Sequence, residues 1–273
     1  MFFPELTRNA KAACGNQQER TKVLWVESVS LTKVFAHRGF SGAAPENTLS
    51  AFEKAVEAKA DGVELDVHLS RDGHVIVMHD EKVDRTTDGT GWIKDMTLAE
   101  LKQLDNGSWF HPSFQNEPVP TLGEVLERLE GVPVEINIEL KNGIIRYPGL
   151  EQKVIAEVER FHVQGRVILS SFRHESLLAV KQARPGMQTG ALYACGMVDP
   201  WVYAKYLGVD AVHPHHLAVT AGMIDGCHRH GIRVRPYTVN EEKEMKRLMD
   251  AGADAVITNY PDRMRKLLSP KEK

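Results

Sequence analysis

Residues 60–69 read Ala-Asp-Gly-Val-Glu-Leu-Asp-Val-His-Leu, and this stretch decides the fold. It joins the end of a helical pattern to a strand-like run in which apolar and polar residues alternate. Its opening returns in similar form at residues 208–212 (Gly-Val-Asp-Ala-Val) and 252–256 (Gly-Ala-Asp-Ala-Val). Each copy follows a helical pattern and opens an apolar strand. Small residues at such a junction are typical of the loops that lead from a helix into a parallel strand.

Strand-like runs alternate with helical patterns along most of the chain. The helical stretches carry apolar residues at spacings of three and four, as at Leu49, Phe52 and Val56. Strands are expected over residues 33–36, 62–69, 75–78, 134–140, 167–170, 189–193, 211–213, 232–237 and 255–258. Alternating β and α elements predict a parallel sheet covered by helices, and about eight such strands favour a closed (β/α)₈ TIM barrel. A Gly-rich dinucleotide fingerprint does not follow the first strand, which weakens the Rossmann alternative.

The same pattern divides the chain into three parts. Residues 1–30 show little periodicity and are expected to form a loosely ordered N-terminal extension. The barrel is expected over residues 31–268. The strand spacing breaks once, so a small insertion is expected after the second strand, over about residues 82–130. This segment contains two short helices with capping-box starts at residues 97–100 and 121–124.

The bulk composition is that of an ordinary soluble protein, with 42% hydrophobic and 26% charged residues and a formal net charge of −3. This balance gives no reason to expect nucleic acid as a partner, or a purely electrostatic role at a membrane surface. No apolar run approaches the length of a membrane span, and the start of the chain does not resemble a secretory signal. Three scattered cysteines do not make a disulfide framework. We therefore expect a cytoplasmic protein without stable membrane insertion.

Two of the expected strands carry charged residues on one face. Glu64 and Asp66 alternate with apolar residues in one strand, and Glu139 and Lys141 do so in another. The alternative is a pair of amphipathic strands with a wet outer face. In a barrel, however, helices cover the outside, so the apolar faces must point outward and the charged faces inward. Buried carboxylates need a cation or basic partners, which predicts a metal site with oxygen ligands.

Two histidines belong with these carboxylates. His37 and Arg38 follow the first strand, at the end that carries the active site in barrels. An Asp-Gly turn signal at residues 72–73 predicts a hairpin in which Asp66 lies opposite His79, with Cβ atoms about 5 Å apart. The alternative is a register that slips by one residue. Histidines move protons near neutral pH, and arginine clamps phosphate oxygens. The alternatives are histidines that cap or brace loops and a surface arginine.

The motifs that carry this chemistry resemble those of the glycerophosphodiester phosphodiesterases. They occur in consistent order from about Lys33 to Met264. The matching segments are Phe35-Ala36-His37-Arg38-Gly39, Pro45-Glu46-Asn47-Thr48, Gly62-Val63-Glu64-Leu65-Asp66-Val67, Val77-Met78-His79-Asp80, Asp84-Arg85-Thr86-Thr87, Ile138-Glu139-Leu140-Lys141, Tyr237-Thr238-Val239-Asn240 and Thr258-Asn259-Tyr260-Pro261-Asp262.

The resemblance implies a TIM barrel that hydrolyses glycerophosphodiesters to sn-glycerol 3-phosphate and an alcohol. These small-molecule substrates are deacylated phospholipids, such as glycerophosphocholine or glycerophosphoethanolamine. The implied catalytic pair is His37 and His79. The implied metal ligands are Glu64, Asp66 and Glu139, and the implied phosphate contacts are Arg38 and Lys141. The implied cofactor is one divalent cation, Ca²⁺ or Mg²⁺, with Mn²⁺ as a further candidate.

Four more residues are candidates at the mouth of the barrel. Tyr237 stands where the family often has a tryptophan, so an aromatic wall for the glycerol is kept with altered size and polarity. Phe172 and His215 are candidates for lining the mouth, with core packing and a loop hydrogen bond as their alternative roles. Glu46 is expected to support the site by orienting Arg38, and its alternative role is that of an acidic residue at a helix N-terminus.

Two other functions are alternatives at this point. A lysophospholipase D or phosphoinositide phospholipase-like activity on lipids needs an apolar access route, for which the loop at Trp109-Phe110 is the candidate. A phosphate-binding barrel without catalysis would lack a histidine or a carboxylate of the site, and all five are present. The sequence does not decide which histidine is the acid, whether water or a hydroxyl of the substrate attacks, or which oligomeric state forms.

Overall fold

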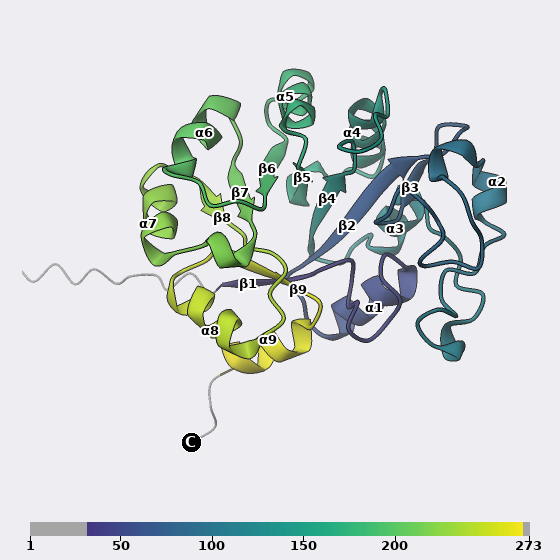
Figure 1. Cartoon of the computed structure of the whole chain (residues 1–273), viewed down its shortest axis with the longest axis horizontal. Helices are drawn as coiled ribbons and strands as arrows, with labels where there is room; N and C mark the ends of the chain where they lie inside the picture. Colours follow the sequence, from purple (N-terminus) through teal and green to yellow (C-terminus); the bar gives the residue numbers. More distant parts are fainter. Residues whose placement is uncertain (1–31, 270–273) are drawn as a thin grey trace, which may run out of the picture.

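The computed structural model describes residues 32–269, whose helices and strands alternate along the chain (Figure 1). The strands are β1 (Lys33–Ala36), β2 (Gly62–Leu69), β3 (Val75–Val77), β4 (Glu135–Leu140), β5 (Val167–Ser171), β6 (Gln188–Tyr193), β7 (Ala211–Pro214), β8 (Arg233–Val234) and β9 (Ala255–Thr258). The α-helices are α1 (Leu49–Glu57), α2 (Leu98–Leu101), α3 (Leu122–Arg128), α4 (Leu150–Arg160), α5 (His174–Ala183), α6 (Pro200–Leu207), α7 (Ala221–Arg229), α8 (Glu242–Asp250) and α9 (Pro261–Leu268). The predicted N-terminal extension, residues 1–30, lies outside the described residues.

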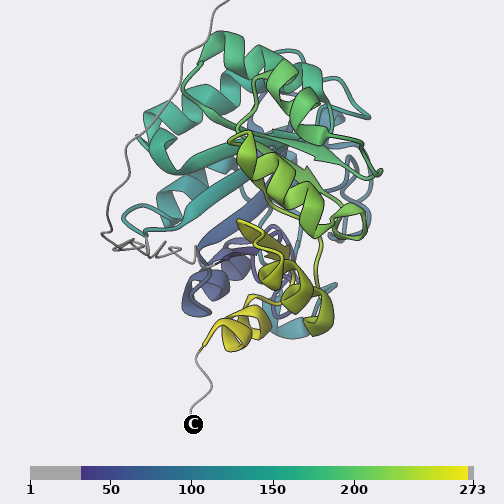
Figure 2. The same cartoon turned by 90° about the vertical axis from the view of Figure 1, so that its left-hand side faces the viewer.

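Eight parallel strands form a nearly closed barrel in the order β8-β7-β6-β5-β4-β2-β1-β9. Backbone hydrogen bonds from Asp254 to Val234 and from Ile257 to Pro236 bring the two ends of this order together. The helices surround the strands in Figure 1, and the quarter-turn view in Figure 2 shows them on the outside again. The predicted TIM barrel is confirmed. Within the described residues, no helix combines the length and the apolar character that crossing a membrane requires.

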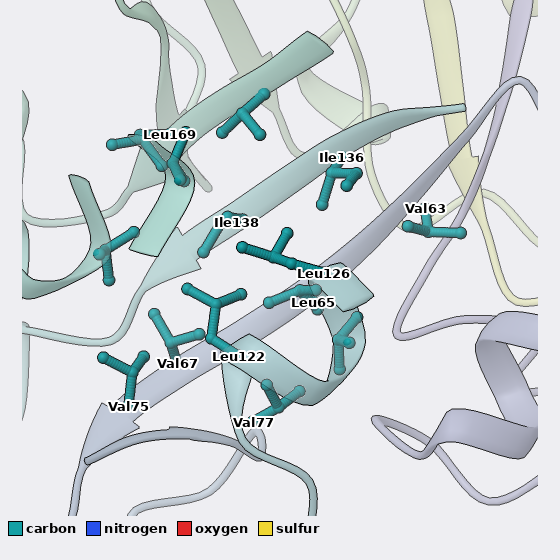
Figure 3. Close-up of a cluster of buried hydrophobic side chains, with 14 of the residues drawn as sticks. Val63, Leu65, Val67, Val75, Val77, Leu122, Leu126, Ile136, Ile138 and Leu169 are labelled. Atoms are coloured by element: carbon teal, nitrogen blue, oxygen red, sulfur yellow. The ribbon is translucent and has the colours of Figure 1, made fainter. Parts of the chain in front are cut away.

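The two charged strands, β2 and β4, turn their apolar faces outward as expected. These side chains belong to one buried cluster with Leu122 and Leu126 of α3 (Figure 3), and those labelled from the two strands are Val63, Leu65, Val67, Ile136 and Ile138. Because side chains alternate along a strand, the carboxylates between them point into the barrel. The parallel register then sets Glu64 beside Asn137 and Asp66 beside Glu139.

The hairpin between β2 and β3 departs from the expected register by one residue. The Met78 N–H donates to the Asp66 carbonyl, so Asp66 lies opposite Met78 and the predicted pairing with His79 is wrong. The loop contains three residues, 71–73, instead of two. Its last residue is a glycine with φ of +83°, a left-handed conformation that glycine adopts without strain. His79 therefore lies beyond the end of β3 and approaches the barrel from a loop.

The segment between β3 and β4 contains η1 (Ile93–Asp95), α2, η2 (Pro112–Phe114) and α3. Both expected capping boxes are present, at the starts of α2 and α3. Because α3 packs on β2 and β4, it serves as the barrel's own crossover helix, although it falls within the range expected for the insertion. The part before α3 has a small core of its own, formed by Ile76, Met78, Val83, Ile93, Leu101 and Val119.

Strand β8 is shorter than the expected range of residues 232–237. Pro236 has no N–H to donate, so it interrupts a continuous ladder. The chain nevertheless stays beside β7, because the Tyr237 N–H donates to the Pro214 carbonyl at 3.1 Å and Tyr237 bridges to His215. Tyr237 is thereby held at the C-terminal mouth of the barrel.

Candidate active site

Three buried carboxylates meet at this mouth. Glu64 and Asp66 come from β2 and Glu139 from the neighbouring β4, and one oxygen of each lies within 4.8 Å of the others. Each of the three residues is less than one-tenth exposed. Burial and repulsion from Asp66 raise the pKa of Glu64 well above its usual value. Burial, opposed by Lys141, raises the pKa of Glu139 to about 7. Glu64 and Glu139 therefore resist ionisation while no cation is bound.

This cluster fits a hard divalent cation. Asp66 Oδ1 is buried and makes no hydrogen bond to any described residue, so it is a free ligand atom. Burial raises the pKa of Asp66, but the charges of Lys141 and Arg38 outweigh burial and hold it well below its usual range. An ionised carboxylate next to two that resist ionisation is an arrangement that a 2+ ion relieves. Oxygen ligands alone suit Ca²⁺, Mg²⁺ or Mn²⁺ better than zinc.

His37 lies directly after β1 and faces the carboxylates. Its Nδ1 is 2.6 Å from Asn259 Oδ1, and its Nε2 is 4.0 Å from Glu64 Oε2. Because an amide oxygen only accepts hydrogen bonds, the proton of the neutral ring is on Nδ1 and the lone pair is on Nε2. Burial, followed by the charge of Arg38, lowers the pKa of His37 to about 4. The ring is therefore neutral at pH 7, with its basic nitrogen toward the cluster.

His79 is fixed on three sides. Its Nδ1 lies 2.6 Å from Asp80 Oδ1, and its Nε2 lies 3.2 Å from Lys141 Nζ. Its backbone carbonyl contacts Nε2 of the buried His68 at 3.0 Å. A carboxylate accepts hydrogen bonds only, so Asp80 keeps a proton on Nδ1 and leaves Nε2 for proton exchange at the mouth.

Arg38 is the first cation of the site. Its backbone N–H donates to Glu64 Oε2 at 2.8 Å, and its Nη1 donates to Glu46 Oε1 at 2.8 Å. Its buried Nε makes no hydrogen bond to any described residue and lies 3.6 Å from Asp66 Oδ2. The residue adopts a φ of +55°, a strained conformation of the kind found at ligand-binding sites. Arg38 thus presents an open donor beside the carboxylates.

Lys141 is the second cation. It follows β4, and its Nζ lies 3.1 Å from Glu139 Oε1 and 3.8 Å from Asp66 Oδ1. Burial lowers the pKa of Lys141, but the attraction of the two carboxylates raises it by more than burial lowers it. The net shift is upward, so the side chain stays charged. The cluster therefore has a permanent positive charge on each side of Asp66.

A closed ring of polar contacts joins these residues. The contacts are Arg38–Glu46 (2.8 Å), Glu46–Arg85 (2.7 Å), Arg85–Asp80 (2.7 Å), Asp80–His79 (2.6 Å), His79–Lys141 (3.2 Å), Lys141–Asp66 (3.8 Å) and Asp66–Arg38 (3.6 Å). Arg85 is the bridge, because it contacts Glu46 and Asp80 with two donors each. Sequence reasoning gave no role to Asp80 or Arg85, although both lie in the quoted motifs.

Two asparagines were also missed. Asn47 donates to Asp66 Oδ2 at 2.9 Å, and Asn259 holds Nδ1 of His37. Each asparagine lies in a segment that supports the family resemblance, and this was the one sign in the sequence that they belong to the site. Their function depends on contacts across 19 and 222 residues of sequence, which spacing alone does not reveal.

The aromatic candidates form a row at the mouth. Tyr237 lines a small pocket that also includes His37, Glu64 and Glu139. The Phe172 ring stands edge-on to Tyr237 at 5.8 Å, and the His215 ring does so at 5.9 Å. Phe172 is 46% exposed, so core packing does not explain it. His215 accepts a weak loop hydrogen bond and reaches this pocket only through Tyr237.

The mouth can neutralise a phosphate and exchange protons beside it. Carboxylates suited to a hard cation are available for the first task together with Arg38 and Lys141, and two imidazoles are available for the second. All of these groups lie at the C-terminal mouth of a TIM barrel, where the active sites of such enzymes are found. The fold and the site together therefore define the class of the phosphoric ester hydrolases.

Comparison with known proteins makes this class specific. The profile of the glycerophosphoryl diester phosphodiesterase family matches residues 37–263. The chain therefore belongs to this family, and the prediction of a glycerophosphodiester phosphodiesterase is confirmed. A glycerophosphodiester phosphodiesterase from Caldanaerobacter subterraneus subsp. tengcongensis is 45% identical over 231 residues, which cover 85% of this chain and 95% of that protein.

Two further relatives agree with this assignment. A glycerophosphodiester phosphodiesterase from Bacillus altitudinis is 42% identical over 240 residues, which cover 87% of this chain and 98% of that protein. Among solved structures, a phosphodiesterase from Oleispira antarctica, in complex with the product sn-glycerol 3-phosphate, is similar with a TM-score of 0.78. It is 34% identical, and the match covers 86% of this chain and 96% of that one.

Proposed function

We propose that the chain hydrolyses glycerophosphodiesters to sn-glycerol 3-phosphate and an alcohol by acid–base catalysis between His37 and His79, with a divalent cation at Glu64, Asp66 and Glu139. The observation that carries the proposal is the position of His37. Its basic nitrogen faces a buried carboxylate cluster that fits a cation, and its ring is neutral at pH 7. When bound, the cation supplies Lewis-acid neutralisation of charge on the phosphoryl oxygens.

We infer the roles of the two histidines from their different partners. His37 takes the proton of the attacking hydroxyl at Nε2, because Asn259 keeps the other ring proton in place. The attacking hydroxyl belongs either to water or to the glycerol of the substrate. His79 delivers a proton to the leaving alcohol from Nε2, and the Asp80 carboxylate stabilises the ring while it is cationic.

Arg38 and Lys141 bind the phosphate. The open Nε of Arg38 donates to one phosphate oxygen. Lys141 turns from Nε2 of His79 to another oxygen when the substrate binds, and this movement frees the histidine for proton transfer. Tyr237 forms the aromatic wall beside the glycerol, and His215 extends that wall. Phe172 stands edge-on to Tyr237, on the side of the leaving alcohol.

Substrate turnover tests this function directly. Release of sn-glycerol 3-phosphate from glycerophosphocholine is measured by phosphorus NMR with Ca²⁺, Mg²⁺ or Mn²⁺. We expect phosphorus signals from the substrate and sn-glycerol 3-phosphate alone if water attacks, and a transient third signal from a cyclic phosphate if the glycerol hydroxyl attacks. Absence of product with every cation would contradict the proposal.

Replacement of Arg85 tests the ring of contacts. The Arg85→Met variant is expected to lose about 10- to 100-fold in kcat, because small displacements of catalytic groups have effects of this size. KM is expected to rise as well, because Glu46 loses the Arg85 donors that hold it in place and so positions Arg38 less firmly. Arg85→Lys, which keeps the charge but not the fork of donors, is expected to be intermediate. Steady-state kinetics and melting temperatures are measured for each variant.

A matched control separates position from general stability. Arg128, the last residue of α3, is similarly exposed and pairs with Glu53 of α1 at 3.0 Å, outside the ring of contacts. Arg128→Met is expected to leave kcat and KM within about twofold, because exposed ion pairs contribute little. If Arg85→Met behaved like Arg128→Met, the ring would have no positioning role.

A further inference from the structure

A cavity of about 220 Å³ leads from the carboxylates to the rim of the barrel. Glu139 and Lys141 of the site lie in its wall. Its other walls come from the loops that follow β3, β4 and β5, and the contributing residues are Glu81, Ile144, Phe172 and Arg173. A group attached to a phosphate bound at Lys141 can therefore extend into this space. The loop at Trp109-Phe110, expected as an apolar access route, does not line it.

One carboxylate in the wall of this cavity has no partner within the described part of the chain. Lys141 pairs with Glu139 at 3.1 Å, and Arg173 pairs with Glu175 at 3.6 Å. The half-buried Glu81 carboxylate makes no ion pair or hydrogen bond to any residue between 32 and 269. A partly desolvated carboxylate without a partner favours a cationic ligand.

The apolar part of the wall points to the same kind of ligand. Phe172 is 46% exposed and Ile144 is 74% exposed, although both are large apolar side chains beside an active site. Aromatic rings attract cations, and quaternary ammonium groups are bound by aromatic and acidic side chains together. A glycerol or inositol group has no charge to offer Glu81 and would cover these apolar surfaces with hydroxyls.

We propose that this cavity receives the alcohol part of the diester and selects alcohols that carry an ammonium group, choline before ethanolamine. The inference rests on the proposed function and adds the headgroup preference to it. Glu81 provides the charge, and Phe172 and Ile144 contact the methyl groups. The trimethylated ammonium of choline gains from both contributions, whereas the primary ammonium of ethanolamine gains mainly from Glu81.

The test compares kcat/KM for glycerophosphocholine, glycerophosphoethanolamine and glycerophosphoglycerol, with release of the common product sn-glycerol 3-phosphate as the readout. The wild-type enzyme is expected to prefer the first over the third by about tenfold, from the combined charge and aromatic contributions. Glu81→Gln is expected to reduce this ratio about fivefold. Phe172→Leu is expected to reduce the ratio of choline to ethanolamine substrate about threefold.

Glu241→Gln is the matched control. Glu241 is an exposed glutamate before α8, outside the wall of the cavity, and its side chain does not cap the helix. Its removal is expected to leave both ratios unchanged. Equal hydrolysis of all three substrates, or equal effects of Glu81→Gln and Glu241→Gln on the ratios, would overturn the headgroup inference while the proposed function stands. Failure to hydrolyse any of the three would contradict the proposed function itself.

Discussion

Replacement of His37 by asparagine is expected to lower kcat for glycerophosphocholine by about 10²- to 10⁴-fold, the usual contribution of a general base. We assign the His37 ring as the base. It is neutral, its Nδ1 is held by Asn259, and its Nε2 faces the carboxylates. Asparagine is small and polar enough to keep the hydrogen bond to Asn259. The fold should therefore persist, with a melting temperature close to that of the wild type.

The companion variant Asn259→Leu distinguishes chemistry from packing. It leaves the imidazole in place but removes the acceptor that fixes its tautomer. A loss of about 10- to 100-fold, smaller than that of His37→Asn, is expected in kcat. Both variants are assayed at saturating cation. A His37→Asn enzyme that retained kcat within tenfold of the wild type would exclude His37 as the base.

The substitution Glu64→Gln is expected to weaken divalent cation binding and turnover by at least about 100-fold, because one of three ligands loses its charge. The amide oxygen can still accept the N–H of Arg38, so the local backbone is preserved. Isothermal titration calorimetry with Ca²⁺ and Mg²⁺ measures the affinity. Unchanged affinity would remove Glu64 from the metal site.

The pH dependence of cation binding gives an independent test of the same cluster. The pKa of Glu139 is raised to about 7 and that of Glu64 is raised well above its usual value, so the cation-free site holds protons at pH 6 that a cation must displace. Affinity is therefore expected to increase as the pH rises from 5.5 to 8. A raised pKa also means that ionisation destabilises the folded protein. Hence Glu64→Gln is expected to raise the melting temperature of the cation-free protein at pH 8.

The inward placement of the site could be predicted because polar and apolar residues alternate along β2 and β4. In a barrel only one of the two faces of each strand can point outward to the helices, and that face is the apolar one. Helices must cover the apolar faces, so Glu64, Asp66 and Glu139 have to share the interior. The bounds of β2 matched the prediction residue for residue, since its polar and apolar residues alternate without a break.

The details that failed depend on the backbone of single residues. The hairpin register was off by one because residues 71–73 form a three-residue loop that ends in a left-handed glycine, which the Asp-Gly signal does not distinguish from a two-residue turn. The ring through Arg85 was not predictable, because it joins side chains 39 residues apart on two loops whose paths no periodicity describes. That Glu81 has no partner among residues 32–269 is likewise visible only once the partners of its neighbours are known.

The most direct test of the central claim is turnover by the wild-type enzyme after removal of all divalent cations. The protein is stripped with EDTA, its metal content is checked by mass spectrometry, and Ca²⁺, Mg²⁺ or Mn²⁺ is added back in steps during hydrolysis of glycerophosphocholine. We predict negligible release of sn-glycerol 3-phosphate without cation and recovery that saturates as one cation binds per chain. Full activity in EDTA, with no metal retained by the protein, would contradict the account.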